Sequence, residues 1–276
     1  MANLQRIGIV GAGVMGAGIA QVLATAGCDV YLTDRSGAAL ATALNRVAAG
    51  RFGLEAAVDR QSITQAEAAS CLSRIHAVQR LPRELDLAIE AVPEDLTLKI
   101  EVLRELDETL SAATIFASTT SGLSLAALAS VTKRPESVIV WHFASPAPVM
   151  PLAEIVVTTQ TSHHVTEAIV GLAQHVGKNP IVIRDQPLAW GFVTNRIFAS
   201  VTREAAKIVA EGVATPEEVD QLLKDCFRWP TGPFEMFTQT THDWEDQSAA
   251  AELLDADPRT RLARFLFPYT AGSREG

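Results

Sequence analysis

Cysteine is scarce in this chain of 276 residues, which contains only Cys28, Cys71 and Cys226. The three are widely spaced, odd in number and form no CxxC motif, which excludes a disulfide scaffold and a structural zinc site. The histidines show no metal-ligand spacing with a second histidine or cysteine near a carboxylate cluster. We therefore expect no bound metal and a reducing, cytoplasmic environment.

Long apolar runs and basic charge are lacking as well. No stretch approaches the roughly 18–20 apolar residues of a membrane span, and residues 1–6 lack the apolar core of a signal peptide. The chain has 23 Lys and Arg residues against 32 Asp and Glu residues, a net charge of −9. This balance excludes a basic footprint over the whole protein, so we expect neither nucleic acid nor a membrane as a partner.

What is present is a regular alternation of short apolar runs and helical patterns over residues 1–184. The predicted strands are Arg6–Val10, Asp29–Asp34, Leu85–Val92, Thr114–Ser118, Ser137–His142, Ala153–Thr158 and Asn179–Arg184. Helical patterns lie between several of them, as at Thr97–Leu110 and Val165–Val176. This alternation is typical of an α/β fold with a Rossmann-type, doubly wound parallel sheet.

One segment, residues 35–83, interrupts the alternation. It contains no strand-like run and two helical stretches, so we interpret it as an inserted helical hairpin. Its seven arginines and three acidic residues give +4, which leaves −13 for the rest of the chain. An arginine-rich solvated surface and a lobe that receives an anionic group explain this charge about equally well.

Residues 185–276 are predicted to form a smaller, all-α C-terminal domain. A long helical pattern runs over Gly191–Glu211. Thr215 then offers an N-cap for a second helix, with Pro216 at its first position and Glu218 completing a capping box.

A glycine-rich turn predicts a dinucleotide site. Gly11, Gly13 and Gly16 form GxGxxG between a predicted strand and a helix, and Asp34 ends the next strand, 18 residues after Gly16. In this context the glycines allow a tight turn, close approach of the pyrophosphate and close helix packing. Asp34 is expected to bind the adenosine ribose and favour NAD over NADP, although Arg35 beside it is a residue that can face a 2′-phosphate.

Polar residues at the ends of predicted strands suggest the chemistry. His142 follows one strand, and Glu154 comes twelve residues later. Oxidation of an alcohol by NAD needs a base for the hydroxyl proton, and a histidine oriented by a carboxylate suits that task. Ser121 and Asn195 can hold the reacting oxygen. A histidine at a strand end is also often a packed structural residue, and a hydrolase is disfavoured because no GxSxG encloses Ser121.

The chain resembles the L-3-hydroxyacyl-CoA dehydrogenases of the 3-hydroxybutyryl-CoA type over about residues 5–237. The resemblance is carried by the residues above together with Ile7–Gln21, Ile89–Asp95, Pro146–Met150 and Gly232–Glu235. The chain is similar to a divergent member of that family. The resemblance implies that the inserted hairpin helps to bind a CoA thioester. It also implies that the C-terminal helices build the substrate cleft and a homodimer.

The resemblance assigns roles to particular residues. His142 matches the catalytic base and Glu154 the acid paired with it. Ser121 matches the serine that contacts substrate and nicotinamide, and Asn195 the asparagine that faces the reacting oxygen.

Two further matches lie on the nicotinamide side of the cofactor site, at Glu94 and Lys99. Both are therefore predicted to bind the cofactor, together with Gly11, Gly13, Gly16, Asp34 and Ser121.

The sequence departs from the family pattern in the parts that recognise substrate. Glycine replaces serine at Gly122, and Ala144-Ser145 replaces Phe-Asn after His142. The loop that ends at Trp190 is about three residues longer than usual. Residues that some relatives use on CoA align near Ala43 and Gly50, and the usual C-terminal ending is absent.

Three functions therefore stay open. The first is an NAD-dependent dehydrogenase of a 3-hydroxyacyl thioester carried by CoA or by an acyl carrier protein, which as an acidic partner fits the arginine-rich insertion. The second is a dehydrogenase of a free hydroxy acid of the gulonate or carnitine type. The third is a non-catalytic, crystallin-like dinucleotide-binding protein, which would have no need of Ser121, His142, Glu154 and Asn195 together.

Overall fold

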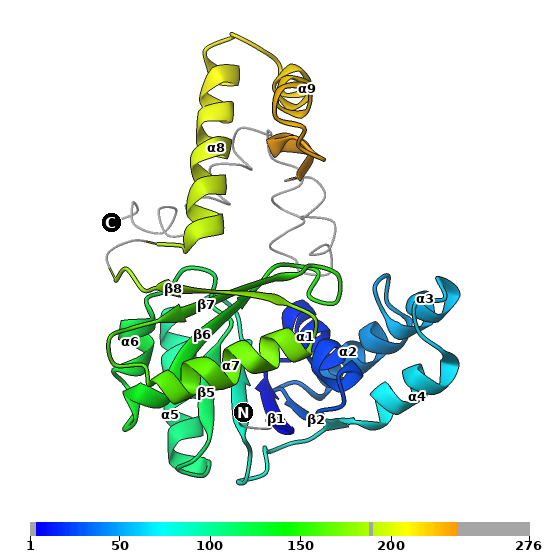
Figure 1. Ribbon diagram of the computed structural model, residues 1–276, viewed down its shortest axis with the longest axis vertical. Coiled ribbons are helices and arrows are strands. Elements are labelled where there is room, and N and C mark those ends of the chain that lie inside the picture. The colour runs from blue at the N-terminus through cyan, green and yellow to red at the C-terminus, as the bar shows by residue number, and fades with distance from the viewer. Residues whose placement is uncertain (1–3, 188–189, 237–276) are drawn as a thin grey trace. The chain divides into compact units, whose positions relative to one another are not determined.

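The computed structural model describes residues 4–187 and 190–236 (Figure 1). The chain divides into two compact units, Met1–Phe192 and Val193–Gly276. The division predicted from the sequence, between residues 184 and 185, remains a prediction. No helix among the described residues is long and apolar enough to cross a membrane.

The first unit is built on one eight-stranded sheet with the order β3-β2-β1-β4-β5-β6-β7-β8. The strands are β1 Arg6–Val10, β2 Asp29–Thr33, β3 Ile75–Ala77, β4 Leu87–Glu90, β5 Ile115–Ser118, β6 Val138–Phe143, β7 Leu152–Val157 and β8 Asn179–Arg184. Neighbouring strands are parallel except at one boundary, where β7 runs antiparallel to β6. The mostly parallel, Rossmann-like sheet confirms the predicted fold class, and the direction of β7 against β6 is a detail that the sequence did not predict.

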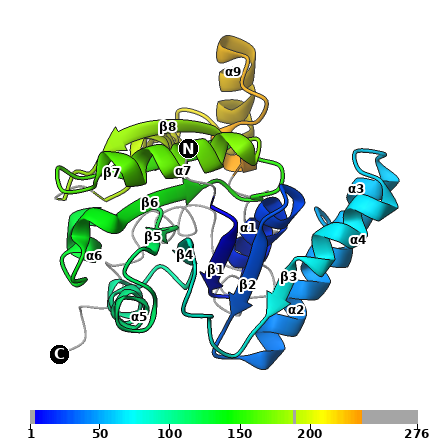
Figure 2. The ribbon, with the colours of Figure 1, turned by 60° about the horizontal axis from the view of Figure 1, so that its bottom comes forward.

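Helices cover both faces of this sheet, as Figure 2 shows for α1 and α5. On one face, α1 (Val14–Thr25) and α7 (His163–His175) pack on alternate strand residues such as Ile9 and Trp141. On the other face, α5 (Leu96–Thr109) and α6 (Leu125–Ala129) pack on Phe116. A short 3₁₀ turn at Pro135–Ser137 leads into β6. Because the central strands are buried on both faces, they are continuous apolar runs in the sequence.

The inserted segment differs from the predicted two-helix hairpin. It contains three helices and a strand, namely α2 Gly37–Ala49, α3 Leu54–Asp59, α4 Gln65–Ser73 and β3 Ile75–Ala77. Strand β3 pairs in parallel with β2 at the edge of the sheet. Only Ile75 of β3 is buried, so the strand is too short and too exposed to show an apolar pattern.

In the second unit the described residues include the helices α8 (Val193–Ala210) and α9 (Pro216–Phe227), and residues 233–236 are helical as well. The predicted capping box is present, because Thr215 accepts a hydrogen bond from the Glu218 N–H and Glu218 bonds back to Thr215. Buried Asp220 accepts hydrogen bonds from the backbone N–H groups of the turn after α9. Residues 237–276 of the predicted all-α domain lie outside the described residues.

Thiol labelling provides a first test of this packing. Burial raises the pKa of the Cys28 thiol to about 11 and also raises the pKa of the Cys71 thiol, whereas Cys226 is exposed. Since the thiolate is the reactive form, we expect a thiol reagent at about pH 8 to label one cysteine in the native protein, at Cys226. All three should react after unfolding in denaturant. Rapid labelling of a second thiol in the native protein would contradict the buried positions of Cys28 and Cys71.

Candidate active site

The candidate site lies at the carboxyl ends of the parallel strands. β1, β4, β5 and β6 run in the same direction, so their last residues lie on the same side of the first unit. β1 and β4 are neighbours in the sheet, but the helices that follow them, α1 and α5, lie on opposite faces. A crevice at such a switch point is where open α/β sheets bind ligands.

The glycine turn after β1 has the shape that a pyrophosphate requires. Gly11 has a φ of 107°, which favours glycine. A Cβ on Gly16 would lie 1.9 Å from the Gly11 carbonyl oxygen, whereas a Cβ on Gly13 would meet nothing within 4 Å. Helix α1 begins directly after Gly13 and has no side chain capping its N-terminus. Free N–H groups beside open space fit a phosphate-bearing cofactor.

Asp34 lies next to this turn and is held in place on both of its oxygens. Oδ2 accepts a hydrogen bond from the Ala12 N–H at 2.8 Å, and Oδ1 accepts one from the Ser36 N–H at 2.9 Å. A carboxylate has further lone pairs beyond these two, so it can still accept from ribose hydroxyls. Its position and charge fit NAD.

A pair of alanine substitutions separates the packing role of these glycines from their binding role. We expect Gly16→Ala to lower the free energy of unfolding by ~1–3 kcal/mol, because its Cβ would overlap the Gly11 carbonyl. Gly13→Ala should leave thermal unfolding unchanged and weaken NAD binding about tenfold, ~1.4 kcal/mol, in calorimetric titration. Equal losses of stability in the two variants would rule out the open space beside Gly13.

The proposed base and its carboxylate face each other across β6 and β7. Their antiparallel register pairs His142 with Glu154, and the His142 Nδ1 lies 2.6 Å from the Glu154 Oε2. His142 is 5% exposed and Glu154 3% exposed. An ionised carboxylate only accepts hydrogen bonds, so Nδ1 carries the donated proton and Nε2 is left as the basic nitrogen. The ring of Phe192 packs 5.9 Å from the imidazole, centre to centre.

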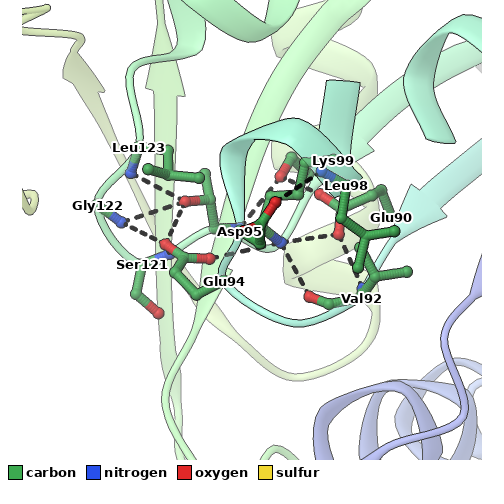
Figure 3. Close-up of polar contacts among 11 residues, drawn as sticks. Glu90, Val92, Glu94, Asp95, Leu98, Lys99, Ser121, Gly122 and Leu123 are labelled. Carbon is green, nitrogen blue, oxygen red and sulfur yellow. Dashed lines mark hydrogen bonds and ion pairs between the residues drawn. The ribbon is translucent and has the colours of Figure 1, made fainter. Parts of the chain in front are cut away.

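A buried ion pair lies at the end of β4 (Figure 3). Lys99 of α5 is 1% exposed, and its Nζ lies 2.7 Å from Oε1 of the fully buried Glu90 at the end of β4. Glu90 also accepts hydrogen bonds from the Ser118 hydroxyl at 2.6 Å and the Val92 N–H at 2.8 Å. Burial raises the pKa of the Glu90 carboxyl, against the lowering by Lys99 and the hydrogen bonds.

Glu94 connects this ion pair to the loop that carries Ser121. Its Oε2 lies 3.4 Å from Lys99 Nζ. Its Oε1 accepts hydrogen bonds from the Thr120 hydroxyl at 2.5 Å, the Ser121 N–H at 2.9 Å and the Gly122 N–H at 3.2 Å, as Figure 3 shows for the labelled residues. The network of contacts among Glu90, Lys99 and Glu94 therefore fixes the backbone of Ser121.

The structure brings together most of the predicted site residues, but not all of them. Ser121 follows the end of β5, and His142 lies near the end of the adjacent strand β6, where it pairs with Glu154 of β7. Asn195 lies in the first turn of α8, in the second unit, and its contact with substrate remains a prediction. Among the described residues, no group of three or more His, Cys, Asp or Glu is placed to hold a metal ion.

Two residues of the site were not predicted from the sequence. Glu90 underlies the whole network, and Thr120 supplies the shortest hydrogen bond to Glu94. The signal for Glu90 was available, since a glutamate inside a strand that is apolar on both sides must have a buried partner. Thr120 lies in a polar loop, where one hydroxyl residue does not stand out from another.

Family models match nearly the whole chain. The model described as 3-hydroxyacyl-CoA dehydrogenase, NAD binding domain, matches residues 6–186. The model described as 3-hydroxyacyl-CoA dehydrogenase, C-terminal domain, matches residues 191–268. The second match extends past residue 237, where the resemblance in the sequence motifs ended.

Individual relatives agree with these models. A probable 3-hydroxybutyryl-CoA dehydrogenase of Bacillus subtilis is 36% identical over 233 residues, covering 84% of this chain and 79% of the relative. The human mitochondrial hydroxyacyl-coenzyme A dehydrogenase is 34% identical over 245 residues, covering 84% and 75%. Among solved structures, the (S)-3-hydroxybutyryl-CoA dehydrogenase of Ralstonia eutropha has a TM-score of 0.81 and 35% identity, covering 96% of this chain and 93% of that one.

Proposed function

The chain belongs to the 3-hydroxyacyl-CoA dehydrogenase family of NAD-dependent oxidoreductases acting on CH–OH groups, and we propose that it oxidises the 3-hydroxyl of a 3-hydroxyacyl-CoA with His142 as the base. One observation carries the role of His142. The His142 imidazole, which is hydrogen-bonded to Glu154, lies at the carboxyl ends of the parallel strands, as does the glycine turn that fits NAD. A candidate base and a turn that fits the cofactor therefore lie at the carboxyl ends of parallel strands of one sheet, with β4 and β5 between them.

The reaction needs a proton and a hydride to leave the same carbinol. His142 Nε2 takes the proton from the 3-hydroxyl, and Glu154 stabilises the imidazolium that forms. NAD, when bound, would supply the acceptor for the hydride that leaves C3, so that the alcohol would become a ketone with the charges balanced. In the reverse direction the same imidazolium returns the proton to the oxygen.

Other residues hold the reactants in place. The N–H groups at the start of α1 would hold the pyrophosphate of the cofactor, and Asp34 would hold its ribose. Glu94 fixes the Ser121 backbone, which supports a role for the Ser121 hydroxyl in holding the reacting oxygen beside the nicotinamide. Asn195 is assigned to the same oxygen. Donors fixed before the reaction stabilise developing charge without reorganisation.

CoA is the proposed carrier, and an acyl carrier protein is the second candidate. The relatives are named for CoA thioesters. The carrier protein is favoured by the exposed arginines of residues 35–83, such as Arg60, Arg80 and Arg83. Such a positive surface attracts an acidic protein and would do so less at high salt.

We also propose that the second unit pairs with that of a second copy. Ile197 of α8 and Leu222 and Phe227 of α9 are large apolar side chains with more than half of their surface exposed. Apolar surface of this kind is typical of subunit interfaces. Light scattering should give a dimer mass for the full chain, and a monomer mass would overturn this pairing.

An NADH assay with a panel of substrates tests the proposed function. We expect turnover with L-3-hydroxybutyryl-CoA and NAD, and a kcat/KM at least about tenfold lower with NADP, because Asp34 repels a 2′-phosphate. The other arms are the same acyl group on an acyl carrier protein, free 3-hydroxybutyrate, gulonate and carnitine. Faster turnover of the carrier-protein substrate than of the CoA thioester would identify the acyl carrier protein as the carrier. Turnover of free acids alone, or of nothing, would overturn the proposal.

A further inference from the structure

The segment Trp190–Phe192 contacts both strand ends that carry the proposed catalytic groups. The Gly191 N–H donates a hydrogen bond to the Gly122 carbonyl at 3.1 Å, next to Ser121. Phe192 is buried, and its ring packs on that of His142. Gly191 has a φ of 83°, a conformation that favours glycine and turns the chain between the two contacts.

Trp190 occupies the space that a side chain at position 122 would fill. A Cβ on Gly122 would lie 2.7 Å from Trp190 Cε2 and 2.8 Å from Trp190 Nε1, so the indole lies directly against the glycine. Gly122 and the loop ending at Trp190 are both departures from the family sequence pattern. A Cβ at position 122 would also lie 2.7 Å from the Gly191 nitrogen, so a larger residue there would have to displace the indole and the backbone of Gly191.

The indole is also partly open, with 43% of Trp190 exposed. A large aromatic residue that is half exposed beside a proposed substrate-binding loop offers an apolar wall to a ligand. We propose that Trp190 limits the length of the acyl chain and makes the enzyme specific for short 3-hydroxyacyl thioesters.

This limit on acyl-chain length rests on the proposed function. If C3 of the substrate lies between His142 and Ser121, the carbons beyond C3 extend over the residues that flank those two side chains. Trp190 flanks Ser121 through Gly122, and Phe192 flanks His142. The indole fills volume beside Gly122 that a longer acyl chain would need.

Trp190→Ala, compared with wild type, tests this proposal. The measured quantity is kcat/KM for 3-hydroxydecanoyl-CoA divided by kcat/KM for 3-hydroxybutyryl-CoA. We expect this ratio to rise about 10- to 200-fold in Trp190→Ala. This is the range by which one added or missing methylene changes kcat/KM in an apolar pocket. Trp190→Phe should give a smaller rise, and Gln186→Ala, an exposed residue of the same loop, should leave the ratio unchanged.

Binding of unreactive acyl-CoAs provides a readout that does not depend on turnover. The dissociation constant of decanoyl-CoA relative to that of butyryl-CoA should fall in Trp190→Ala by a similar factor. Circular dichroism establishes that the variants are folded, and if Trp190→Ala unfolds then Trp190→Phe carries the test.

The outcomes distinguish this proposal from the proposed function. A wild-type enzyme that oxidises 3-hydroxybutyryl-CoA while the ratio stays within about twofold in Trp190→Ala would overturn the role of Trp190 alone. Equal losses on both substrates would also overturn it, because they would make Trp190 a structural residue of the loop. A wild-type enzyme inactive on every thioester would overturn both proposals.

Discussion

His142→Asn is expected to lower kcat by about 10²- to 10⁴-fold with L-3-hydroxybutyryl-CoA and NAD. Asparagine keeps a polar side chain of similar size in the buried position but cannot take a proton from the hydroxyl. Since the glycine turn and Asp34 are unchanged, the dissociation constant of NAD should stay within about twofold of the wild-type value. Steady-state kinetics and calorimetric titration measure the two quantities.

His164→Asn is the matched control, because His164 is an exposed histidine at the start of α7. Its kcat should equal that of wild type. If His142→Asn keeps more than about a tenth of the wild-type kcat, the proton is taken by another group and His142 is a structural residue.

Lys99→Met is expected to lower the free energy of unfolding by ~3–5 kcal/mol, the usual cost of removing one partner of a buried ion pair. The substitution leaves the carboxylate of Glu90 without a buried cation. Without Lys99 the pKa of Glu90 in the folded state lies still further above its value in the unfolded state. Such a group destabilises the fold increasingly as pH rises, so the loss should be larger at about pH 8 than at about pH 5. Denaturant unfolding at the two pH values measures it.

Two further variants complete this test. Glu90→Gln combined with Lys99→Met removes both charges, and we expect it to recover part of the stability lost in Lys99→Met. Lys133→Met replaces an exposed lysine and should change stability by less than ~0.5 kcal/mol. If Lys99→Met is no less stable than Lys133→Met, the ion pair with Glu90 does not form in the protein.

The sequence predicted the sheet and its cofactor turn because both follow from local patterns. Buried parallel strands are continuous apolar runs, and GxGxxG has a meaning at the end of such a run. The pairing of His142 with Glu154 has a different origin. It depends on β7 reversing direction, so that two residues twelve apart in the chain become direct neighbours across an antiparallel pair. Apolar periodicity carries no information on strand direction, and the family resemblance supplied the pairing instead.

Other features could not be predicted because they depend on contacts distant in sequence. The contact between Trp190 and Gly122 joins residues 68 apart in the chain, and only the fold brings the indole to the glycine. Lys99 was predicted as a residue of the cofactor site. The structure places its ammonium group among protein oxygens, so we propose that it acts on the cofactor site through Glu94.

The central claim, that this chain transfers a hydride from C3 of a 3-hydroxyacyl-CoA to NAD, is tested most directly by isotope transfer. The wild-type enzyme is incubated with NAD and L-3-hydroxybutyryl-CoA that carries deuterium at C3, and the mass of the NADH formed is measured by mass spectrometry. The account predicts one deuterium in each NADH and an unlabelled C3 in the 3-oxobutyryl-CoA. NADH without deuterium, or no NADH from this thioester, would contradict it.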